Sequence, residues 1–315
     1  MSLALTFPGQ GSQAVGMGKA LADAFAPARA VFDEVDDALS QPLSRLTFEG
    51  PTDELTLTAN AQPALMAVSM AVLRVLEAEA GLDVARDAAF VAGHSLGEYS
   101  ALAAAGSLSI ADTARLLRIR GDAMQRAVPV GEGAMAALLG LDYADAAAVA
   151  ADAAQGEVCE AANDNGPGQV VVSGHKAAVD RAVALAQERG AKRAILLPVS
   201  APFHCALMQP AAEAMRAALA EVRLAAPVVP LVANVTAGRL TDPEEIRASL
   251  VAQVTGTVRW RESVAFMAGE GVDMFYELGA GKVLTGLAKR IAPGAGTTAI
   301  GTPADVAALV AARNG

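Results

Sequence analysis

Hydrophobic positions along the chain form two kinds of run, which alternate in the sequence. Short, mainly apolar runs of strand length occur at Leu3–Phe7, Ala88–Ala92, Pro230–Val235 and Met274–Leu278. Longer stretches repeat their apolar residues every three or four positions, as in Ile110–Val128, and predict amphipathic helices. Because a parallel sheet requires strands that alternate with helices, the pattern predicts an α/β core with such a sheet.

The pattern changes between residues 133 and 199. It predicts a strand, a helix, two strands, a helix and a strand, at Ala134–Leu141, Tyr143–Gln155, Glu157–Asn163, Gln169–Ser173, Ala177–Arg189 and Arg193–Val199. This βαββαβ order is typical of a ferredoxin-like unit. We therefore predict a small subdomain at 131–199, inserted into a larger core made of 1–130 and 200–315. Near the end of that core, Gly279–Val283 leads into one last long helix.

The stretch from Phe90 to Leu102 combines an apolar strand, a Gly-x-Ser-x-Gly turn and a helix. Ser95 is at the apex, and Gly93 and Gly97 have no side chains to obstruct strand, helix or substrate. The helix would point its free N–H groups at whatever Ser95 attacks and so stabilise an anion there. A glycine-rich turn with a capping serine is the simpler interpretation, but the flanking strand and helix favour a nucleophile.

A serine nucleophile needs a base, usually a histidine, and the chain has 3 histidines. His94 directly precedes Ser95, so at a sharp turn it points away and is interpreted as structural. His175 lies at a predicted helix start, where a capping or surface role is favoured. His204 remains, in a loop just after Pro202, from which it can reach a neighbouring carboxyl edge. No histidine follows it, so the Ser-acid-His order of the usual hydrolase fold is absent.

Two further features indicate a ligand. The glycine-rich loop Pro8–Gln13 follows the first predicted strand, at the edge where α/β proteins bind ligands, although a plain strand-to-helix turn has the same pattern. In the predicted helix Ile110–Val128, Arg120 lies about 150° round from the charged face, between Leu117 and Leu116. A buried guanidinium needs an anion. A substrate anion and a structural Asp or Glu are equally good partners, and the side chain can also reach the surface.

Composition narrows the class of protein. A chain of 315 residues that is 53% hydrophobic and 4% aromatic is typical of a packed α/β interior. Its net charge of −10 argues against a nucleic acid partner, whose phosphates would be repelled. No apolar run reaches the roughly 18 residues of a membrane span and no signal peptide is recognisable, so we expect a cytoplasmic protein without membrane contact. Cys159 and Cys205 lack metal-ligand spacing and predict reduced thiols and no metal site.

Several ordered motifs together resemble the malonyl-CoA:acyl-carrier-protein transacylase family of bacterial fatty-acid synthesis. They extend over nearly the whole chain: Pro8–Gln13, Gln62-Pro63, Gly93–Gly97, Arg120-Gly121, Asn165–Gln169, Ala201–His204, Gln253 and Gly279–Lys282. The resemblance implies an α/β-hydrolase-like core with a ferredoxin-like insert, in agreement with the pattern of strands and helices. It also implies transfer of a malonyl group from malonyl-CoA to the phosphopantetheine thiol of a holo acyl carrier protein.

The resemblance implies catalytic roles for individual residues. Ser95 would attack the malonyl thioester, and His204 would take its proton. The histidine of the family is oriented by a main-chain carbonyl, near the position of Gln253, rather than by an acid. The N–H groups of Gln10 and Leu96 match those of the oxyanion hole of the family.

Substrate-binding roles follow from the same resemblance. Arg120 would hold the free malonyl carboxylate through a two-pronged ion pair. Asn165 and Gln253 are also expected to contact the substrate. Leu96 and Phe203 match the malonyl form of related acyltransferases, although some bacterial relatives have a serine in place of Phe203. We expect Phe203 to fill space beside the α-carbon and to disfavour an α-methyl group.

The resemblance implies no cofactor, because the carrier protein brings its own phosphopantetheine, and we expect a monomer. Carrier proteins of this pathway are acidic, so an overall charge of −10 requires a local basic surface. Candidate residues are Lys176, Arg181, Arg189, Lys192 and Arg193 in the insert, or Lys282, Lys289 and Arg290. Three alternatives stay open: a thioester hydrolase that uses Ser95 and His204, a trans-acting acyltransferase of a polyketide synthase, and a non-catalytic docking module.

Overall fold

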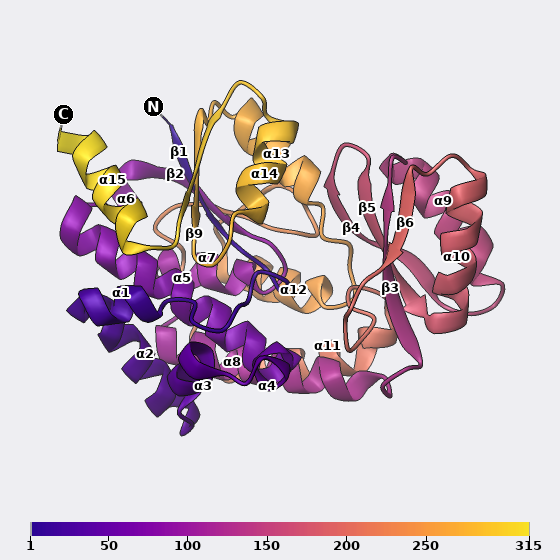
Figure 1. Ribbon diagram of the computed structural model, residues 1–315, viewed down its shortest axis with the longest axis horizontal. Helices are drawn as coiled ribbons and strands as arrows, with labels where there is room; N and C mark the ends of the chain where they lie inside the picture. The colour runs from indigo at the N-terminus through magenta and orange to yellow at the C-terminus, as the bar shows by residue number, and fades with distance from the viewer. Residues whose placement is uncertain (1, 315) are drawn as a thin grey trace.

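A computed structural model describes residues 2–314 and contains two β-sheets with helices packed around them (Figure 1). The larger sheet has the strand order β10-β9-β1-β2-β7-β8. Its strands are β1 (Leu3–Phe7), β2 (Ala88–Gly93), β7 (Leu231–Val232), β8 (Arg239–Leu240), β9 (Met274–Leu278) and β10 (Gly296–Ile300). All neighbours pair in parallel except β8, which runs antiparallel to β7. The predicted α/β core with a parallel sheet is confirmed.

The central strand β1 is buried on both faces, which explains why it has apolar residues at all positions except Thr6. Leu3, Leu5 and Phe7 pack into the larger apolar cluster on one face of the sheet. Ala4, between them, faces a separate cluster on the other side. A strand covered on both faces needs apolar residues at successive positions rather than at alternate ones.

Helices cover both faces of the larger sheet. The other face, with Ala4, is covered by α13 (Trp260–Gly269) and α14 (Val283–Ile291). The larger cluster holds the remaining helices of the core: α1 (Lys19–Ala24), α2 (Ala26–Leu39), α3 (Leu43–Glu49), α4 (Thr52–Thr56), α5 (Thr58–Ala80), α6 (Val84–Asp87), α7 (Gly97–Ala104), α8 (Ile110–Ala127), α11 (Gln209–Ala220), α12 (Pro243–Gln253) and α15 (Pro303–Asn314). A single 3-10 turn, Ala206–Met208, precedes α11.

Helix α5 corrects one expectation from the sequence. Its 23 residues are long and apolar enough to cross a membrane, although the apolar runs had been expected to be too short. In the fold, 89% of the most apolar stretch of α5 is buried inside the protein, against α2, α7 and α8. Its apolar composition is therefore explained by its place at the centre of the larger core cluster.

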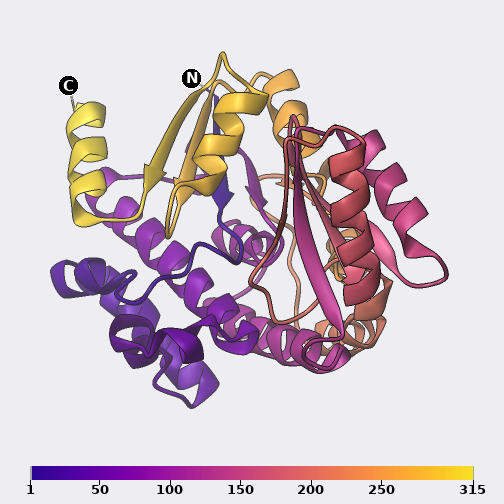
Figure 2. The ribbon, with the colours of Figure 1, turned by 45° about the vertical axis from the view of Figure 1, so that its right-hand side comes forward.

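The smaller sheet forms a layer of its own beside the core (Figure 2). Its antiparallel strand order is β4-β5-β3-β6, with β3 (Gly133–Leu139), β4 (Cys159–Gly166), β5 (Gln169–His175) and β6 (Arg193–Leu196). Helices α9 (Tyr143–Ala154) and α10 (Lys176–Glu188) pack on it around a separate apolar cluster. The βαββαβ order of the ferredoxin-like unit is confirmed, whereas 131 and 199 as domain limits stay a prediction.

The end of the chain differs from the expected single long helix. Helix α14 ends at Ile291, and β10 and α15 follow it. The break coincides with Pro293 and Gly294, two residues that a helix interior disfavours. The antiparallel strand β8 was also not expected; it is only two residues long, too short to show a period in the sequence.

Candidate active site

Ser95 lies in the turn between β2 and α7, beyond the carboxyl end of the strand. Its φ of +53° is in the left-handed region, a strained conformation for a residue with a side chain. A Cβ on Gly93 would lie 1.9 Å from the Gly97 carbonyl oxygen, and one on Gly97 would lie 2.2 Å from the Phe7 carbonyl oxygen. Only glycine fits at both positions, so strand, helix and loop approach closely and hold Ser95 out above the sheet.

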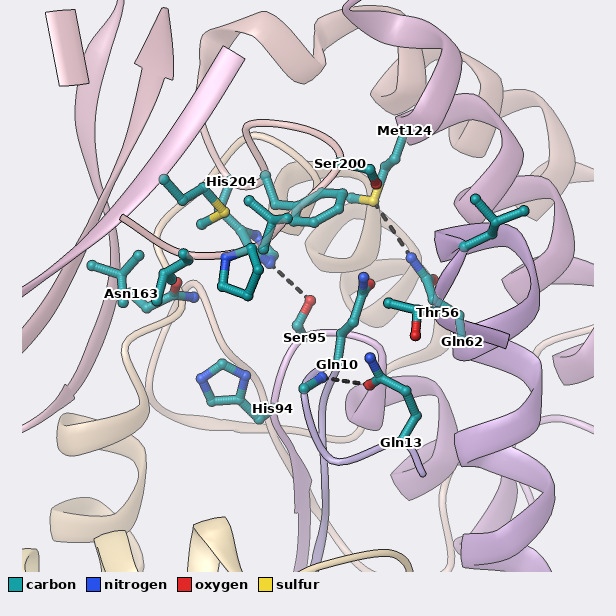
Figure 3. A pocket seen from close by; sticks show the side chains of 18 of the residues that line it. Gln10, Gln13, Thr56, Gln62, His94, Ser95, Met124, Asn163, Ser200 and His204 are labelled. Carbon is teal, nitrogen blue, oxygen red and sulfur yellow. Dashed lines mark hydrogen bonds between the residues drawn. The ribbon is translucent and has the colours of Figure 1, made fainter. Parts of the chain in front are cut away.

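His204 reaches Ser95 from the loop between β6 and α11 (Figure 3). Its Nε2 lies 2.8 Å from Ser95 Oγ, and its Nδ1 lies 2.9 Å from the main-chain oxygen of Gln253. Because a carbonyl only accepts, the proton belongs on Nδ1, and Nε2 can accept from the serine. Burial, and then the positive charge of Arg120, lower the pKa of His204 to about 3. The imidazole is therefore neutral near pH 7, the form that a general base requires.

Two backbone N–H groups beside Ser95 are free for a ligand. Within residues 2–314, neither the N–H of Gln10 nor that of Leu96 donates to a protein acceptor. Leu96 is the N-cap residue of α7, so its N–H belongs to the positive end of the helix dipole. Gln10 lies in the loop after β1 and lines the same pocket as Ser95. The two residues that the resemblance implies for an oxyanion hole thus lie on elements that meet at the serine.

Arg120 is buried in α8, as its place on the apolar side of that helix predicts. It is 1% exposed. Its Nη1 donates to Gln62 Oε1 at 2.9 Å, and its Nη2 donates to Gln253 Oε1 at 2.9 Å and to Ser95 Oγ at 3.2 Å. The guanidinium also lies 5.7 Å from the centre of the Tyr99 ring. These partners fix the guanidinium at the nucleophile while supplying no negative charge.

The sequence left open whether a structural acid pairs with Arg120. All hydrogen bonds of its guanidinium within residues 2–314 go to neutral groups, and its Nε has no partner there. Glu98 acts on it through space rather than by a direct ion pair. Arg120 and Ser95 both line the pocket, so the charge of the arginine is available to an anion bound beside the serine.

The pocket is a cavity of about 790 Å³ at the carboxyl ends of β1 and β2. The core and the insert both contribute to its wall, because β4 and β5 supply Asn163, Asn165 and Val171. In Figure 3, His204 lies above Ser95 and His94 lies below it. A cavity of this size is typical of sites that bind small molecules.

The remaining predicted residues lie in or beside this pocket. Phe203 lines it, and Asn165 Oδ1 lies 2.7 Å from His94 Nε2. His94 was interpreted as purely structural, but it too lines the pocket. His175 is the N-cap residue of α10, yet its side chain does not cap the helix; its Nδ1 accepts from the N–H of Val158 at 3.0 Å. Of the two roles predicted for His175, surface or helix cap, the capping role is wrong, and the side chain is half-buried.

Both cysteines are buried free thiols, as expected, and burial raises their pKa values to about 11. Neither one is therefore a reactive thiolate near neutral pH. Within residues 2–314, no cluster of His, Cys, Asp and Glu side chains is arranged to hold a metal ion.

Two residues of the site were not singled out by sequence reasoning, Glu98 and Asn234, and Gln62 was part of a motif to which no role had been given. Asn234 accepts from the N–H of Ser95 at 2.8 Å and donates to Gly93 O at 2.7 Å, and so holds the turn from the side. It lies two residues beyond the end of β7, a carboxyl-edge position that could have marked it. Glu98 had no such signal, because an acidic residue in the first turn of a helix is sufficiently explained by its favourable interaction with the helix dipole.

Residues 5–292 match the acyl transferase domain family. The chain is 48% identical over 307 residues to the malonyl CoA-acyl carrier protein transacylase of Escherichia coli strain K12, covering 98% of each chain. It superposes on the crystal structure of the acyl-carrier-protein S-malonyltransferase of Bartonella henselae with a TM-score of 0.97, at 59% identity and 100% coverage of both. A malonyl-transacylase in complex with its type II PKS acyl-carrier protein gives a TM-score of 0.95, at 42% identity, covering 99% of this chain and 100% of that one.

Proposed function

Since this chain belongs to the acyl transferase domain family, and within it to the malonyl-CoA:acyl-carrier-protein transacylases, we propose how its residues divide the work of malonyl transfer. The reaction moves a malonyl group from the thiol of CoA to the thiol of acyl carrier protein. One observation supports this assignment most strongly. Arg120 is buried beside Ser95 and forms no ion pair with an acidic side chain among the described residues, and Ser95 is itself hydrogen-bonded to His204.

The first half of the reaction forms a malonyl-serine. Ser95 Oγ attacks the thioester carbonyl of malonyl-CoA as its proton passes to His204 Nε2, which lies 2.8 Å away. The N–H groups of Gln10 and Leu96 stabilise the oxyanion of the tetrahedral intermediate. When the carbon–sulfur bond breaks, the same proton goes from His204 to the departing CoA sulfur, which leaves as the free thiol.

The second half reverses these steps with another thiol. The phosphopantetheine thiol of the carrier protein gives its proton to His204 Nε2 and attacks the ester carbonyl. The bond to Ser95 Oγ breaks, and the serine recovers the proton from His204. Every proton and bond is accounted for by the two thiols, the serine and the imidazole, so we propose that the enzyme needs no cofactor.

Specificity for the malonyl group comes from the carboxylate site. Arg120 pairs with the free carboxylate through two parallel N–H···O bonds, and releases Ser95 Oγ as the substrate enters. Phe203, on the pocket wall, disfavours a branch at the α-carbon. Asn165, bound to His94, contacts the acyl chain or its carrier from the insert side.

The partners and the setting of the enzyme follow from the same reaction. Malonyl-CoA and a holo acyl carrier protein are the two substrates. We propose that the enzyme works as a monomer, because the complete site lies within one chain. We also propose that it works in the cytoplasm and away from membranes, and that it does not bind nucleic acid, because its net charge is −10. Sedimentation of the purified protein at micromolar concentration checks the monomer.

A loading experiment distinguishes transfer from hydrolysis. Malonyl-CoA is mixed with the protein and a holo carrier protein, using one carrier from fatty-acid synthesis and one from polyketide synthesis. We expect the carrier to gain a malonyl group and the protein alone to gain it on Ser95, with no gain in Ser95→Ala. Free malonate with an unloaded carrier would instead identify a hydrolase, and the absence of any acyl-serine would identify a docking module. The better-loaded carrier identifies the pathway.

A further inference from the structure

Glu98 is a buried carboxylic acid inside the active-site network that the proposed reaction does not use. It lies in the first turn of α7, three residues after Ser95, and is 0% exposed. Its Oε2 accepts from the main-chain N–H of Asn234 at 2.9 Å and from Gln253 Nε2 at 3.1 Å. Its Oε1 has no hydrogen-bond partner within residues 2–314. Burying a carboxyl group with one unpartnered oxygen costs free energy of folding, so Glu98 is expected to have a function that offsets this cost.

The contacts of Gln253 show what Glu98 does for the site. The side-chain nitrogen of Gln253 faces three oxygen acceptors: Ser95 O at 2.9 Å, Glu98 Oε2 at 3.1 Å and Asn234 Oδ1 at 3.3 Å. Its side-chain oxygen faces Arg120 Nη2 at 2.9 Å. A flipped amide would turn its oxygen toward three acceptors and its N–H₂ toward a guanidinium that can only donate. The acceptors therefore determine which end of the amide meets Arg120.

We propose that Glu98 is a positioning residue for Arg120, acting through the amide of Gln253, and that its charge tunes the preference for acyl groups that carry a carboxylate. This inference rests on the proposed function, because it assumes that Arg120 binds the malonyl carboxylate. Glu98 touches neither the substrate nor the reacting atoms. It sets the direction of the amide oxygen that Arg120 binds and contributes a negative charge behind the arginine.

The charge of Glu98 can change without loss of this geometry. A proton on the unpartnered Oε1 leaves Oε2 free to accept from Asn234 and Gln253 in both protonation states. Burial raises the pKa of Glu98 to about 7, although its hydrogen bonds and the charge of Arg120 oppose the rise. Glu98 is therefore neutral on the acid side of neutral pH and charged on the alkaline side.

Other titratable groups around Glu98 keep one state between about pH 6.5 and pH 8. Arg120, on α8, stays charged. Burial lowers the pKa values of His94 and His204 and raises that of Tyr99, so all three stay neutral. A malonyl carboxylate bound to Arg120 is repelled by a charged Glu98, whereas an acetyl group is not. The preference for malonyl over acetyl groups should therefore fall as the pH rises through neutrality.

The test compares Glu98→Gln with the native protein. A glutamine keeps an oxygen in the place of Oε2 and removes the charge. Acylation of Ser95 by malonyl-CoA and by acetyl-CoA is timed by quenched mass spectrometry from about pH 6.5 to about pH 8, the range in which the neighbouring groups keep one state. In the native protein we expect the malonyl-to-acetyl ratio of kcat/KM to fall about threefold or more over this range. In Glu98→Gln we expect the ratio to stay constant and to equal or exceed the native ratio at low pH.

A matched control is Glu277→Gln. Glu277 is also a buried acid, 1% exposed, but it caps α14 by accepting from the N–H groups of Leu284 and Thr285 and lies outside the pocket. This variant should keep the native pH dependence of the ratio. Glu98→Ala also removes an acceptor of the Gln253 amide, so it should raise KM for malonyl-CoA more than for acetyl-CoA. If Glu98→Ala does not fold, the result for Glu98→Gln is sufficient to test the proposal.

The outcomes separate the inference from the proposed function. If the native protein forms malonyl-serine but Glu98→Gln keeps the native ratio and its pH dependence, Glu98 is only a structural residue and the inference is wrong. A native ratio that does not change with pH would overturn it as well. If the native protein forms no malonyl-serine at all, the proposed function itself fails.

Discussion

At the scale of single residues, the site depends on one charge, that of Arg120, which none of its hydrogen-bond partners neutralises. Arg120 is surrounded by Gln62, Gln253 and Ser95, all of which accept hydrogen bonds without carrying a charge. Carboxamide oxygens fix the guanidinium and offset part of its desolvation cost. A carboxylate in their place would neutralise the arginine and compete with an acidic substrate. The neutral partners therefore leave a preformed anion site directly beside the nucleophile.

Replacing Arg120 tests this site. In Arg120→Ala we expect malonyl transfer to fall by orders of magnitude, because loss of a buried charge partner costs roughly 3–5 kcal/mol. Acetyl transfer, which needs no counter-charge, should stay the same or rise. The measurement is kcat/KM for malonyl-CoA and for acetyl-CoA with one carrier protein.

Arg118→Ala is the control for that experiment. Arg118 lies two residues away on α8 and donates to the side chains of Asn60 and Gln41, outside the pocket. Its loss should leave the malonyl-to-acetyl ratio unchanged. Equal losses for both acyl groups in Arg120→Ala would show that the arginine does not bind the carboxylate.

At the scale of elements, the nucleophile depends on how closely three segments approach one another. Strand β2, helix α7 and the end of β1 meet at Gly93 and Gly97, where a Cβ would lie 1.9 Å and 2.2 Å, respectively, from a main-chain oxygen. The loop between β6 and α11 brings His204, at a φ of +58°, to the same point. The Ser95–His204 hydrogen bond thus joins elements that are far apart in the sequence.

Adding a single methyl group at Gly97 should separate these elements. In Gly97→Ala, the new Cβ would lie 2.2 Å from the Phe7 main-chain oxygen, so α7 must move away from the end of β1. We expect the rate of Ser95 acylation to fall at least about 100-fold, because displacement of a nucleophile by about 1 Å has that effect. We also expect a lower melting temperature, measured by circular dichroism.

Gly286→Ala is the matched control. Gly286 lies on the exposed side of α14, and a Cβ there meets no atom within 4 Å. This change should leave acylation unaffected and stabilise the protein by up to about 1 kcal/mol, because alanine favours the helix. Normal acylation in Gly97→Ala would show that the close approach is not needed to aim the serine.

At the scale of the whole molecule, the pocket is complete only where the insert meets the core. Strand β4 carries Asn163 and Asn165 on the pocket wall, and it is fastened through the residue between them. Asp164, 1% exposed, accepts from Arg261 Nε at 2.9 Å and forms an ion pair with Arg261 Nη2 at 2.8 Å. The main chain adds a bond from Asp164 N to Val258 O at 2.9 Å.

Breaking this ion pair should loosen the pocket wall. In Arg261→Ala, the buried Asp164 carboxylate loses its charged partner, and the free energy of unfolding should fall by about 1–3 kcal/mol, measured with urea. Because the catalytic pair lies in the core, we expect KM for malonyl-CoA to rise more than kcat falls.

The exposed pair of Arg45 and Glu49 on α3 provides the comparison, with side chains 78% and 62% exposed. Removing the charge in Arg45→Ala should change stability by less than about 1 kcal/mol and leave KM unchanged. If Arg261→Ala matched Arg45→Ala in both respects, the ion pair of Asp164 would not be what holds β4.

The sequence by itself determined the features that depend on local pattern. Mainly apolar runs predicted the buried strands, and the periodicity of α8 placed Arg120 on the apolar face of that helix, because the face on which a side chain lies follows directly from the period of the element. The glycines around Ser95 predicted the sharp turn, since few other residues permit such an approach. Elimination among 3 histidines left His204, which lies 2.8 Å from the serine.

The tertiary structure decided what depends on distance between segments. It showed that Gln253 joins Arg120, His204 and Ser95 within one network, and that Arg120 has only neutral partners. It also placed Glu98 behind that network, whereas the sequence alone explains this residue as an acidic side chain that stabilises the first turn of α7. Hydrogen-bond partners more than 100 residues apart leave no period in the sequence, and whether a buried charge is neutralised is settled only when the elements pack.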